Sequence, residues 1–213
     1  MSLSQLAYEK ILNLIINGKY KPGNLLKEDE LANTLNISRT PVREALARLE
    51  RDGIIIKSGK SYSVIPLSAE DIIQIYEIRI PLEAEASKLA SIRGTEEELK
   101  KMLDIIEEIK RVKEDAEPLT LAELNGKLHR TISEASHNKF LVDILENIRL
   151  KLKIVRVTLF TSFQRREEEL REHSEIVTSI IERNPDKAYQ LMKEHELNVL
   201  EYVKKNILPI LFR

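Results

Sequence analysis

The sequence predicts a mostly α-helical protein of two domains: three helices and a β-hairpin in residues 1–66, then an all-α bundle of six helices in residues 68–213. Three observations predict this fold class. Apolar residues recur every three to four positions through most of the chain, as in amphipathic helices. Two β-branched or aromatic runs, Ile54–Lys57 and Tyr62–Ile65, lie on either side of a short turn. Pro66 then interrupts the pattern, and no strand is predicted after it.

Capping residues predict where helices of the second domain begin. Ser68 with Asp71 and Thr95 with Glu98 resemble capping boxes. Further helices are predicted to begin at Pro118, after Asn138 and at Asn184-Pro185, and the helix after Asn138 is predicted to run to about Ser162.

Three helices are predicted before the hairpin. The first spans Ser4–Asn17, with Gly18 as its stop signal, and the second spans Glu28–Leu35. The third begins with Thr40 as N-cap and Pro41 at the first helical position, where a missing N–H costs nothing. The short segment between the second and third helices gives the spacing of a helix-turn-helix.

Arginine side chains gather on the third helix. Its apolar residues are expected to face a core, which leaves Arg39, Arg43 and Arg48 on other faces. Arginine pairs with phosphate, or bidentately with guanine O6 and N7. Residues 1–66 carry 10 Lys and Arg against 7 Asp and Glu, whereas residues 67–213 carry 24 against 28. The basic end is therefore predicted to bind DNA, and its small surplus of charge favours a dimer that pairs two such domains.

The composition excludes several other classes of protein. There is no cysteine, so the chain has neither a disulfide framework nor a thiolate metal site, and any transition metal must be bound by His, Asp, Glu or Asn. No run approaches the ~18 apolar residues of a membrane span, and the N-terminus lacks the apolar core of a signal peptide. We expect a cytoplasmic protein with no membrane partner.

Four histidines occur in the chain, all in the second domain: His129, His137, His173 and His195. Asn125 lies one helical turn before His129, so both side chains can face one metal. His173 and His195 each lie 11 residues from the turn near Asn184, which places them level with each other in an antiparallel helical hairpin. These spacings predict that helices distant in the sequence bring histidines together.

His129 has a comparable depth in the bundle, about eight residues before the turn near His137, so one site can gather three imidazoles. Three imidazoles with an oxygen ligand suit Zn, Ni, Co, Mn or Fe. His137 lies at the turn itself and is predicted to be a helix-end residue. The alternative is that each histidine is an ordinary polar residue of the surface or core.

The segment SRTPVREALARLERDG, which begins at Ser38, resembles the recognition helix of the GntR family of bacterial winged-helix transcription regulators. Pro22-Gly23 followed by Leu31-Ala32 is similar to the lead-in of that family. The resemblance implies DNA contacts by Arg39, Thr40, Arg43 and, at the tip of the hairpin wing, Gly59 and Lys60. Ser38 and Arg48 are either phosphate contacts or solvated surface residues.

Residues 68–205 resemble the FCD domain, the all-helical effector-binding module of one GntR subfamily. The metal-binding members carry Asp-x-x-x-His and two later histidines, which correspond here to Asn125, His129, His173 and His195. Asn125 departs from that pattern, and a neutral amide is a poorer ligand than a carboxylate. Arg79 and Glu83 match the family's Arg-x-x-x-Glu segment. Arg79 either binds the carboxylate of an organic-acid effector or forms an i,i+4 surface pair with Glu83.

The leading prediction is a homodimeric DNA-binding regulator, a repressor, that binds a roughly palindromic double-stranded DNA operator. A small carboxylate effector is expected to reach a divalent metal in the helical domain, with Zn or Ni foremost. No residue is predicted to be catalytic. A metal-dependent hydrolase is the alternative of another class, with Glu172 and Glu194 as bases. Neighbours on a helix point about 100° apart, so neither glutamate should face a metal bound by the adjacent histidine. A purely structural metal is the third possibility.

Overall fold

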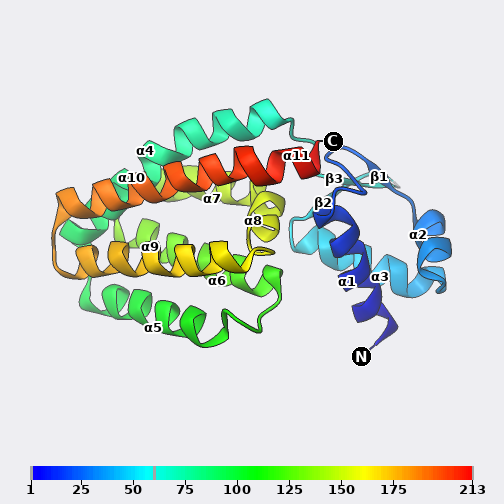
Figure 1. The fold of residues 1–213 in the computed structure, drawn as a ribbon, viewed down its shortest axis with the longest axis horizontal. Helices are drawn as coiled ribbons and strands as arrows, with labels where there is room; N and C mark the ends of the chain where they lie inside the picture. The colour runs from blue at the N-terminus through cyan, green and yellow to red at the C-terminus, as the bar shows by residue number, and fades with distance from the viewer. Residues whose placement is uncertain (1, 60, 213) are drawn as a thin grey trace. The chain divides into compact units, whose positions relative to one another are not determined.

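The computed structural model describes residues 2–59 and 61–212 (Figure 1). The predicted fold class is confirmed: the chain is mostly helical, with one small antiparallel sheet near the N-terminus. It divides into two compact units. We call Met1–Ile72 with Lys205–Arg213 the N-terminal unit, and Ile73–Lys204 the helical unit. No helix of the described ranges is long and apolar enough to cross a membrane.

The N-terminal unit has a helix-turn-helix and a three-stranded sheet. Its elements are α1 (Leu3–Ile16), β1 (Leu25–Leu26), α2 (Glu28–Leu35), α3 (Arg39–Arg51), β2 (Ile55–Ser58) and β3 (Ser61–Val64). β3 pairs antiparallel with both other strands, with Leu26 opposite Tyr62 and Ile56 opposite Ser63. β1 was not predicted, because two residues are too short to show the alternation that marks a strand.

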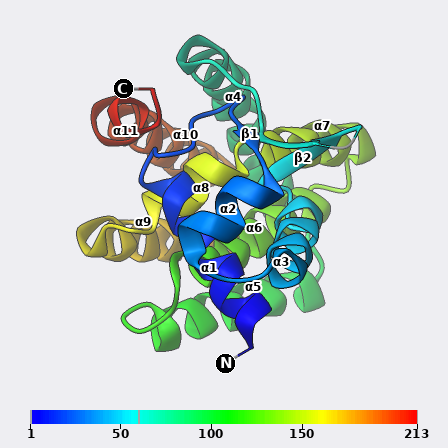
Figure 2. The same cartoon turned by 90° about the vertical axis from the view of Figure 1, so that its right-hand side faces the viewer.

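The core of the N-terminal unit lies where α1 packs against α3 (Figure 2). Its fully buried residues are Ala7, Ile11 and Ile15 from α1 and Val42, Ala45, Leu46 and Leu49 from α3. Asn36 ends α2 in the left-handed conformation, with φ of 53°, which turns the chain sharply into α3. This geometry leaves the first residues of α3 free to face outward.

The predicted start of α3 was wrong by two residues. Ser38 holds the N-cap position with extended backbone, and the helix begins at Arg39 rather than after Thr40. Pro41 still lies in the first turn, where backbone N–H groups have no partner within the helix. A proline therefore fits there as well as at the first position.

The helical unit contains α4 (Ala69–Arg93), α5 (Glu96–Val112), α6 (Pro118–Ala135), α7 (Lys139–Lys151), α8 (Lys153–Leu159), α9 (Phe163–Ile181) and α10 (Pro185–Tyr202). The capping boxes predicted at Ser68 with Asp71 and at Thr95 with Glu98 are confirmed. α9 and α10 pack as an antiparallel hairpin, and α6 contacts α5, α7 and α8. The side chains of α6, α9 and α10 can therefore meet inside the bundle.

The helix predicted from Asn138 to about Ser162 is two helices. α7 ends at Lys151, and Leu152, with ψ of 8°, leads into α8. α7 buries one face. α8 has seven residues, and five of them are buried: Ile154, Val155, Val157, Thr158 and Leu159. A segment that is apolar nearly all round must enter the core, so the chain turns at Leu152.

The C-terminal segment continues α10 through a π-helical turn, Val203–Ile207, into α11 (Leu208–Leu211). Leu211 is fully buried, within the same compact unit as the N-terminal helices. Gly18 has φ of 71°, and a Cβ atom there would overlap the carbonyl oxygen of Ile210. Both the backbone conformation and this close approach require glycine at the end of α1.

Candidate nucleic-acid interface and metal centre

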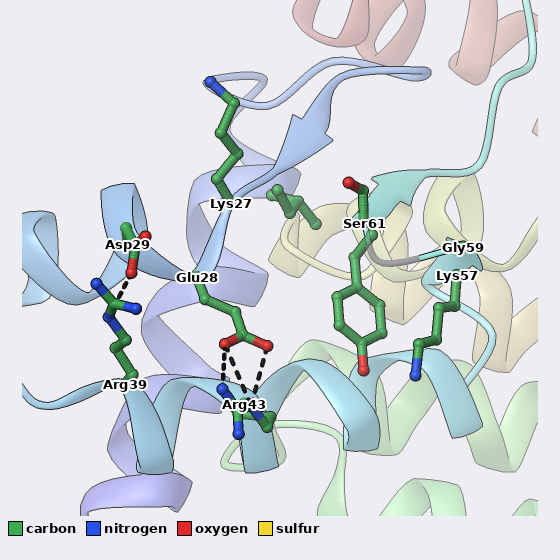
Figure 3. Close-up of a pocket in the computed structure, with 10 residues that line it drawn as sticks. Lys27, Glu28, Asp29, Arg39, Arg43, Lys57, Gly59 and Ser61 are labelled. Atoms are coloured by element: carbon green, nitrogen blue, oxygen red, sulfur yellow. Dashed lines mark hydrogen bonds and ion pairs between the residues drawn. The ribbon is translucent and has the colours of Figure 1, made fainter.

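The start of α3, the start of α2 and the hairpin surround an open cavity of about 510 Å³ (Figure 3). The structure brings three of the predicted DNA contacts to this cavity: Arg39, Arg43 and Gly59. Lys27 and Lys57 line it too, and sequence reasoning had not singled them out. This is the basic, concave face of the N-terminal unit.

Both arginines of this face are held by carboxylates of α2. Arg43 makes a bidentate contact with Glu28, with Nη2 at 2.8 Å from Oε2 and Nε at 3.1 Å from Oε1. Arg39 forms an ion pair with Asp29. The hydrogen bond from Arg43 lowers the pKa of Glu28. These pairs fix the two guanidinium groups in place, and they use the same fork of donors that phosphate or guanine would use.

The remaining predicted DNA contacts are placed differently. Ser38 and Thr40 are exposed at the N-terminal end of α3. Arg48 instead points to α1, where it donates to Gln5 and lies 4.1 Å from the ring centroid of Tyr8. It does not line the cavity described above. Lys60 lies outside the described residues.

In the helical unit, three histidines from three helices meet: His129 of α6, His173 of α9 and His195 of α10. All three are almost fully buried, and one ring nitrogen of each lies within 4.8 Å of the others. We call these three residues the histidine cluster. His137 ends α6 with φ of 49°, lies outside the cluster and contacts Glu98.

A glutamate faces the Nδ1 atom of each ring in the histidine cluster. Oε2 of Glu83 lies 3.1 Å from Nδ1 of His129, and Oε2 of Glu172 lies 2.6 Å from Nδ1 of His195. Oε2 of Glu169 is more distant, at 3.9 Å from Nδ1 of His173.

The Nε2 atoms of His129 and His173 face each other at 3.1 Å. Carboxylates at Nδ1 with Nε2 free are the usual surroundings of metal-binding histidines. Two neutral rings whose Nδ1 atoms carry the protons would otherwise direct their Nε2 lone pairs at each other, and a bound cation removes that repulsion.

Burial governs the protonation of these rings. It lowers the pKa of His129, and it lowers the pKa of His173 well below the ordinary range. At His195 burial acts in the same direction, but Glu169 and the hydrogen bond with Glu172 outweigh it and raise the pKa. Metal ligands must be neutral imidazoles, and the surroundings of His129 and His173 favour that form.

Asn125 lies beside the histidine cluster. Its Nδ2 donates to Oε2 of Glu169 at 2.9 Å. A cavity of about 10 Å³, which we call the inner cavity, is lined by Tyr76, Arg79, Asn125, His129, Arg156, Leu159, Glu169, His195 and Val199. Its volume is about that of a single water molecule or ion. Three of the four residues named by the spacing argument, Asn125, His129 and His195, therefore line a space of ionic size, and His173 does not line it.

Arg79 also lines the inner cavity, and it is only 4% exposed. Its Nη2 lies 2.8 Å from Glu196, and its Nε lies 3.5 Å from Glu83. Burial opposes the charge of Arg79, but Glu196 and Glu83 together raise its pKa. The i,i+4 pair with Glu83 exists, but it is buried rather than at the surface.

Sequence reasoning missed four charged residues around the histidine cluster: Glu169, Glu196, Arg149 and Arg156. Glu172 was expected to point away from the site. It does point away from the neighbouring His173, but it reaches His195 on the next helix. A signal existed for Glu169, since it precedes His173 by one helical turn.

Models of known protein families match both units of the chain. Residues 3–64 match the model of the bacterial regulatory proteins of the gntR family, and residues 74–198 match the FCD domain. The chain belongs to the GntR family. GntR-family members with this helix-turn-helix are DNA-binding transcriptional regulators, and this chain is a regulator of the GntR/FCD type.

Relatives from the same family extend over nearly the whole chain. The HTH-type transcriptional regulator YdhC of Bacillus subtilis, itself uncharacterized, is 34% identical over 92% of this chain and 89% of its own length. LutR of B. subtilis, an HTH-type transcriptional regulator, is 31% identical over 91% of this chain and 100% of its own length. McbR/YncC of E. coli has the same fold, with a TM-score of 0.63, 20% identity and coverage of 96% and 100% of the two chains.

Proposed function

We propose that this GntR-family regulator is a repressor that binds a roughly palindromic operator as a homodimer. Its affinity for the operator depends on a divalent metal and a small carboxylate in the helical unit. One observation carries the proposal: one ring nitrogen of each of three buried imidazoles lies within 4.8 Å of the others, and a glutamate faces Nδ1 of each ring. That arrangement suits metal binding far better than three independent polar residues.

The metal ligands in this proposal are His129, His173 and His195, with Asn125 as the neutral oxygen ligand. Imidazole ligands suit Zn and Ni foremost, and Co, Mn or Fe also accept this set. Asn125 presents its amide nitrogen to Glu169, so its oxygen is the atom left for a metal. The absence of a carboxylate at this position predicts weaker binding than an aspartate would give.

Arg79 is proposed to bind the effector's carboxylate, because it lines the inner cavity with His129 and His195. The guanidinium is already paired with Glu196 and Glu83, so an effector must replace one of these carboxylates. Exchange of one carboxylate for another at Arg79 shifts α4 against α10, because Glu83 lies on α4 and Glu196 lies on α10. Regulation follows if this shift differs between the DNA-bound and free states.

Dimerisation through α4 and α7 is part of the proposal. A cluster of apolar residues joins these helices: Leu82, Ala86, Leu141 and Leu145. On the same two helices, Ile78, Phe140 and Ile144 are 57%, 69% and 48% exposed. Exposed apolar side chains of this size are typical of an interface between subunits.

Enzymatic activity is not part of the proposal. The relatives named above are transcriptional regulators, and the nearest glutamates contact the outer nitrogens of the histidine rings. A base for hydrolysis must instead reach a metal-bound water. A purely structural metal is the second candidate, since the histidine cluster joins α6, α9 and α10.

The test compares metal content and operator binding in three samples of untagged protein. These are the wild type, His173→Ala, and His137→Ala as a matched control, because His137 is 46% exposed and lies outside the cluster. We expect near-stoichiometric metal in the wild type and the control, and little in His173→Ala. No metal in the wild type, even after incubation with Zn or Ni, would contradict the metal site.

Operator binding on the same samples separates regulation from a purely structural metal. A regulatory metal predicts that His173→Ala stays folded at low temperature and binds the operator, but no longer responds to a carboxylate. A structural metal predicts loss of folding on chelation and an unchanged carboxylate response in the protein that remains folded.

A further inference from the structure

A second cavity of the helical unit, about 220 Å³ in volume, lies between α6, α7 and α8; we call it the outer cavity. Five cationic side chains line it: Lys127, Arg130, Arg149, Lys153 and Arg156. Only two carboxylates do so, Glu123 and Glu146. The lining therefore carries a surplus of positive charge, in a chain whose net charge is −1.

The two carboxylates do not neutralise this lining. Glu146 is shared between Arg130 and Arg149, with Nη2 of Arg149 at 3.0 Å. Glu123 lies 3.8 Å from Lys153. No carboxylate of the described residues lies within ion-pair distance of Arg156. A buried cation without a counter-ion is costly unless a ligand supplies the charge.

Two guanidinium nitrogens in this lining are buried and lack a hydrogen-bond partner in the described part of the chain: Nη1 of Arg149 and Nη2 of Arg156. Arg149 is 3% exposed, and its Nη1 lies 3.8 Å from Glu83, too far for a hydrogen bond. Buried donors are nearly always satisfied in folded proteins, so a pair of unmet donors beside a cavity indicates an absent acceptor.

Arg156 belongs to both cavities, since it also lines the inner cavity with His129 and His195. Gly126 makes room for it, because a Cβ atom there would lie 2.9 Å from Nη1 of Arg156. Burial lowers the pKa of Arg156 to about 10, and Arg79 acts in the same direction. The side chain is still protonated at neutral pH, and its surroundings are short of negative charge.

We propose that the outer cavity binds the second carboxylate of a small dicarboxylate effector, through Arg149, Arg156 and Lys153. The first carboxylate takes the place of Glu196 or Glu83 at Arg79 and reaches the metal, since the inner cavity itself has room for a single ion, and Arg156 lies between the two groups. The inference rests on the proposed function in taking the inner cavity as the effector site. A volume of about 220 Å³ is below the roughly 300–1,000 Å³ of sites for drug-sized ligands, so it suits a metabolite of a few carbons.

The probes are succinate and butyrate, which have the same number of carbons and differ by one carboxylate. Each is titrated calorimetrically into full-length zinc-loaded and metal-free protein at constant ionic strength. A charge-assisted hydrogen bond contributes about 1.5–3 kcal/mol, so we expect succinate to bind at least about tenfold more tightly than butyrate. We expect the preference to persist in weaker form without metal.

Variants of the outer cavity assign the preference to its residues. Lys153→Met should reduce the succinate preference by about tenfold or more and leave butyrate affinity and zinc content unchanged. Arg156→Met should reduce the preference as well, and it should also weaken butyrate binding, because Arg156 lines the inner cavity. Lys151→Met is the matched control, because Lys151 is exposed and does not line the cavity. Lys153 is only partly buried, so its variant folds even if Arg156→Met does not.

Zinc content of the same samples separates this inference from the proposed function. Bound zinc with equal affinity for the two probes would overturn the dicarboxylate site and leave the metal site standing. A preference for succinate that survives both variants would overturn it as well. If the wild type binds no metal but prefers succinate, and the variants lose that preference, the result supports the outer cavity and contradicts the metal proposal.

Discussion

The ion pairs at the two candidate sites lie in opposite surroundings. In the N-terminal unit, Arg39 and Arg43 are each 65% exposed and pair with carboxylates at the surface. In the helical unit, Arg79 and Glu83 are 4% and 0% exposed and pair inside the bundle. Exposed pairs contribute little and exchange easily, whereas removing one partner of a buried pair leaves an uncompensated charge.

This difference matches the two kinds of ligand in the proposed function. A DNA phosphate that binds these arginines must displace Asp29 and Glu28, so these pairs should be weak. A metal needs ring nitrogens in fixed positions, so the glutamates around the histidine cluster should be rigid and costly to remove. The burial of an ion pair, more than its geometry, therefore indicates whether a ligand can displace one of its partners.

The largest expected effect separates the two kinds of pair by stability. We expect Glu83→Ala to lower the free energy of unfolding by roughly 3–5 kcal/mol, because it removes the buried carboxylate that faces Nδ1 of His129 and leaves Arg79 paired with Glu196. Glu28→Ala removes a carboxylate of the surface pair and should cost about 0–1 kcal/mol. Urea unfolding followed by circular dichroism measures both. Equal losses in the two variants would contradict the comparison.

Metal should stabilise the helical unit through the histidine cluster. Zinc at about 100 times its dissociation constant should add roughly 2.7 kcal/mol to the free energy of unfolding, since a ligand that binds only the folded state stabilises by mass action. Thermal melts with zinc and with a chelator measure this difference. His173→Ala should abolish it, and His137→Ala should retain it. A zinc effect that is the same in both variants would place the metal elsewhere.

The sequence was sufficient for the features that local patterns encode. The bounds of α2 were predicted in full, and residue counts from the turn near Asn184 predicted that His173 and His195 stand level, as they do. Capping residues fixed the starts of α5, α6, α7 and α10. These features depend on spacing along one or two neighbouring helices.

Contacts between side chains of different helices were missed, because they depend on how each helix is rotated in the bundle. Glu172 was judged from the direction of its own helix, but its partner His195 lies on the next helix. Nothing in the spacing of Arg149 and Arg156 indicates that both reach the same cavity. The break at Leu152 results from burial of α8 in the tertiary core, which overrides the continuous helical pattern.

A smaller effect concerns the arginine that Glu28 holds. Arg43→Ala should weaken operator binding by about 1–3 kcal/mol, or roughly 5- to 150-fold, if Arg43 reads a guanine or binds phosphate. Arg51→Ala is the control, because Arg51 is exposed near the end of α3 and does not line the cavity of Figure 3. Fluorescence anisotropy with labelled operator measures both. Equal weakening would show that only the charge of the N-terminal unit matters.

The smallest effect tests whether the surface pairs restrain DNA binding. Asp29→Asn frees Arg39 and removes a negative charge that faces the DNA, so affinity should rise by about two- to fivefold. Glu30→Gln changes the net charge equally, but Glu30 pairs with Lys27 and leaves Arg39 untouched. Titrations at two salt concentrations compare the variants. If both raise affinity alike, charge alone accounts for the effect. A larger rise for Asp29→Asn that persists at higher salt would show that Asp29 holds Arg39 away from DNA, because a local contact is screened less than a long-range field.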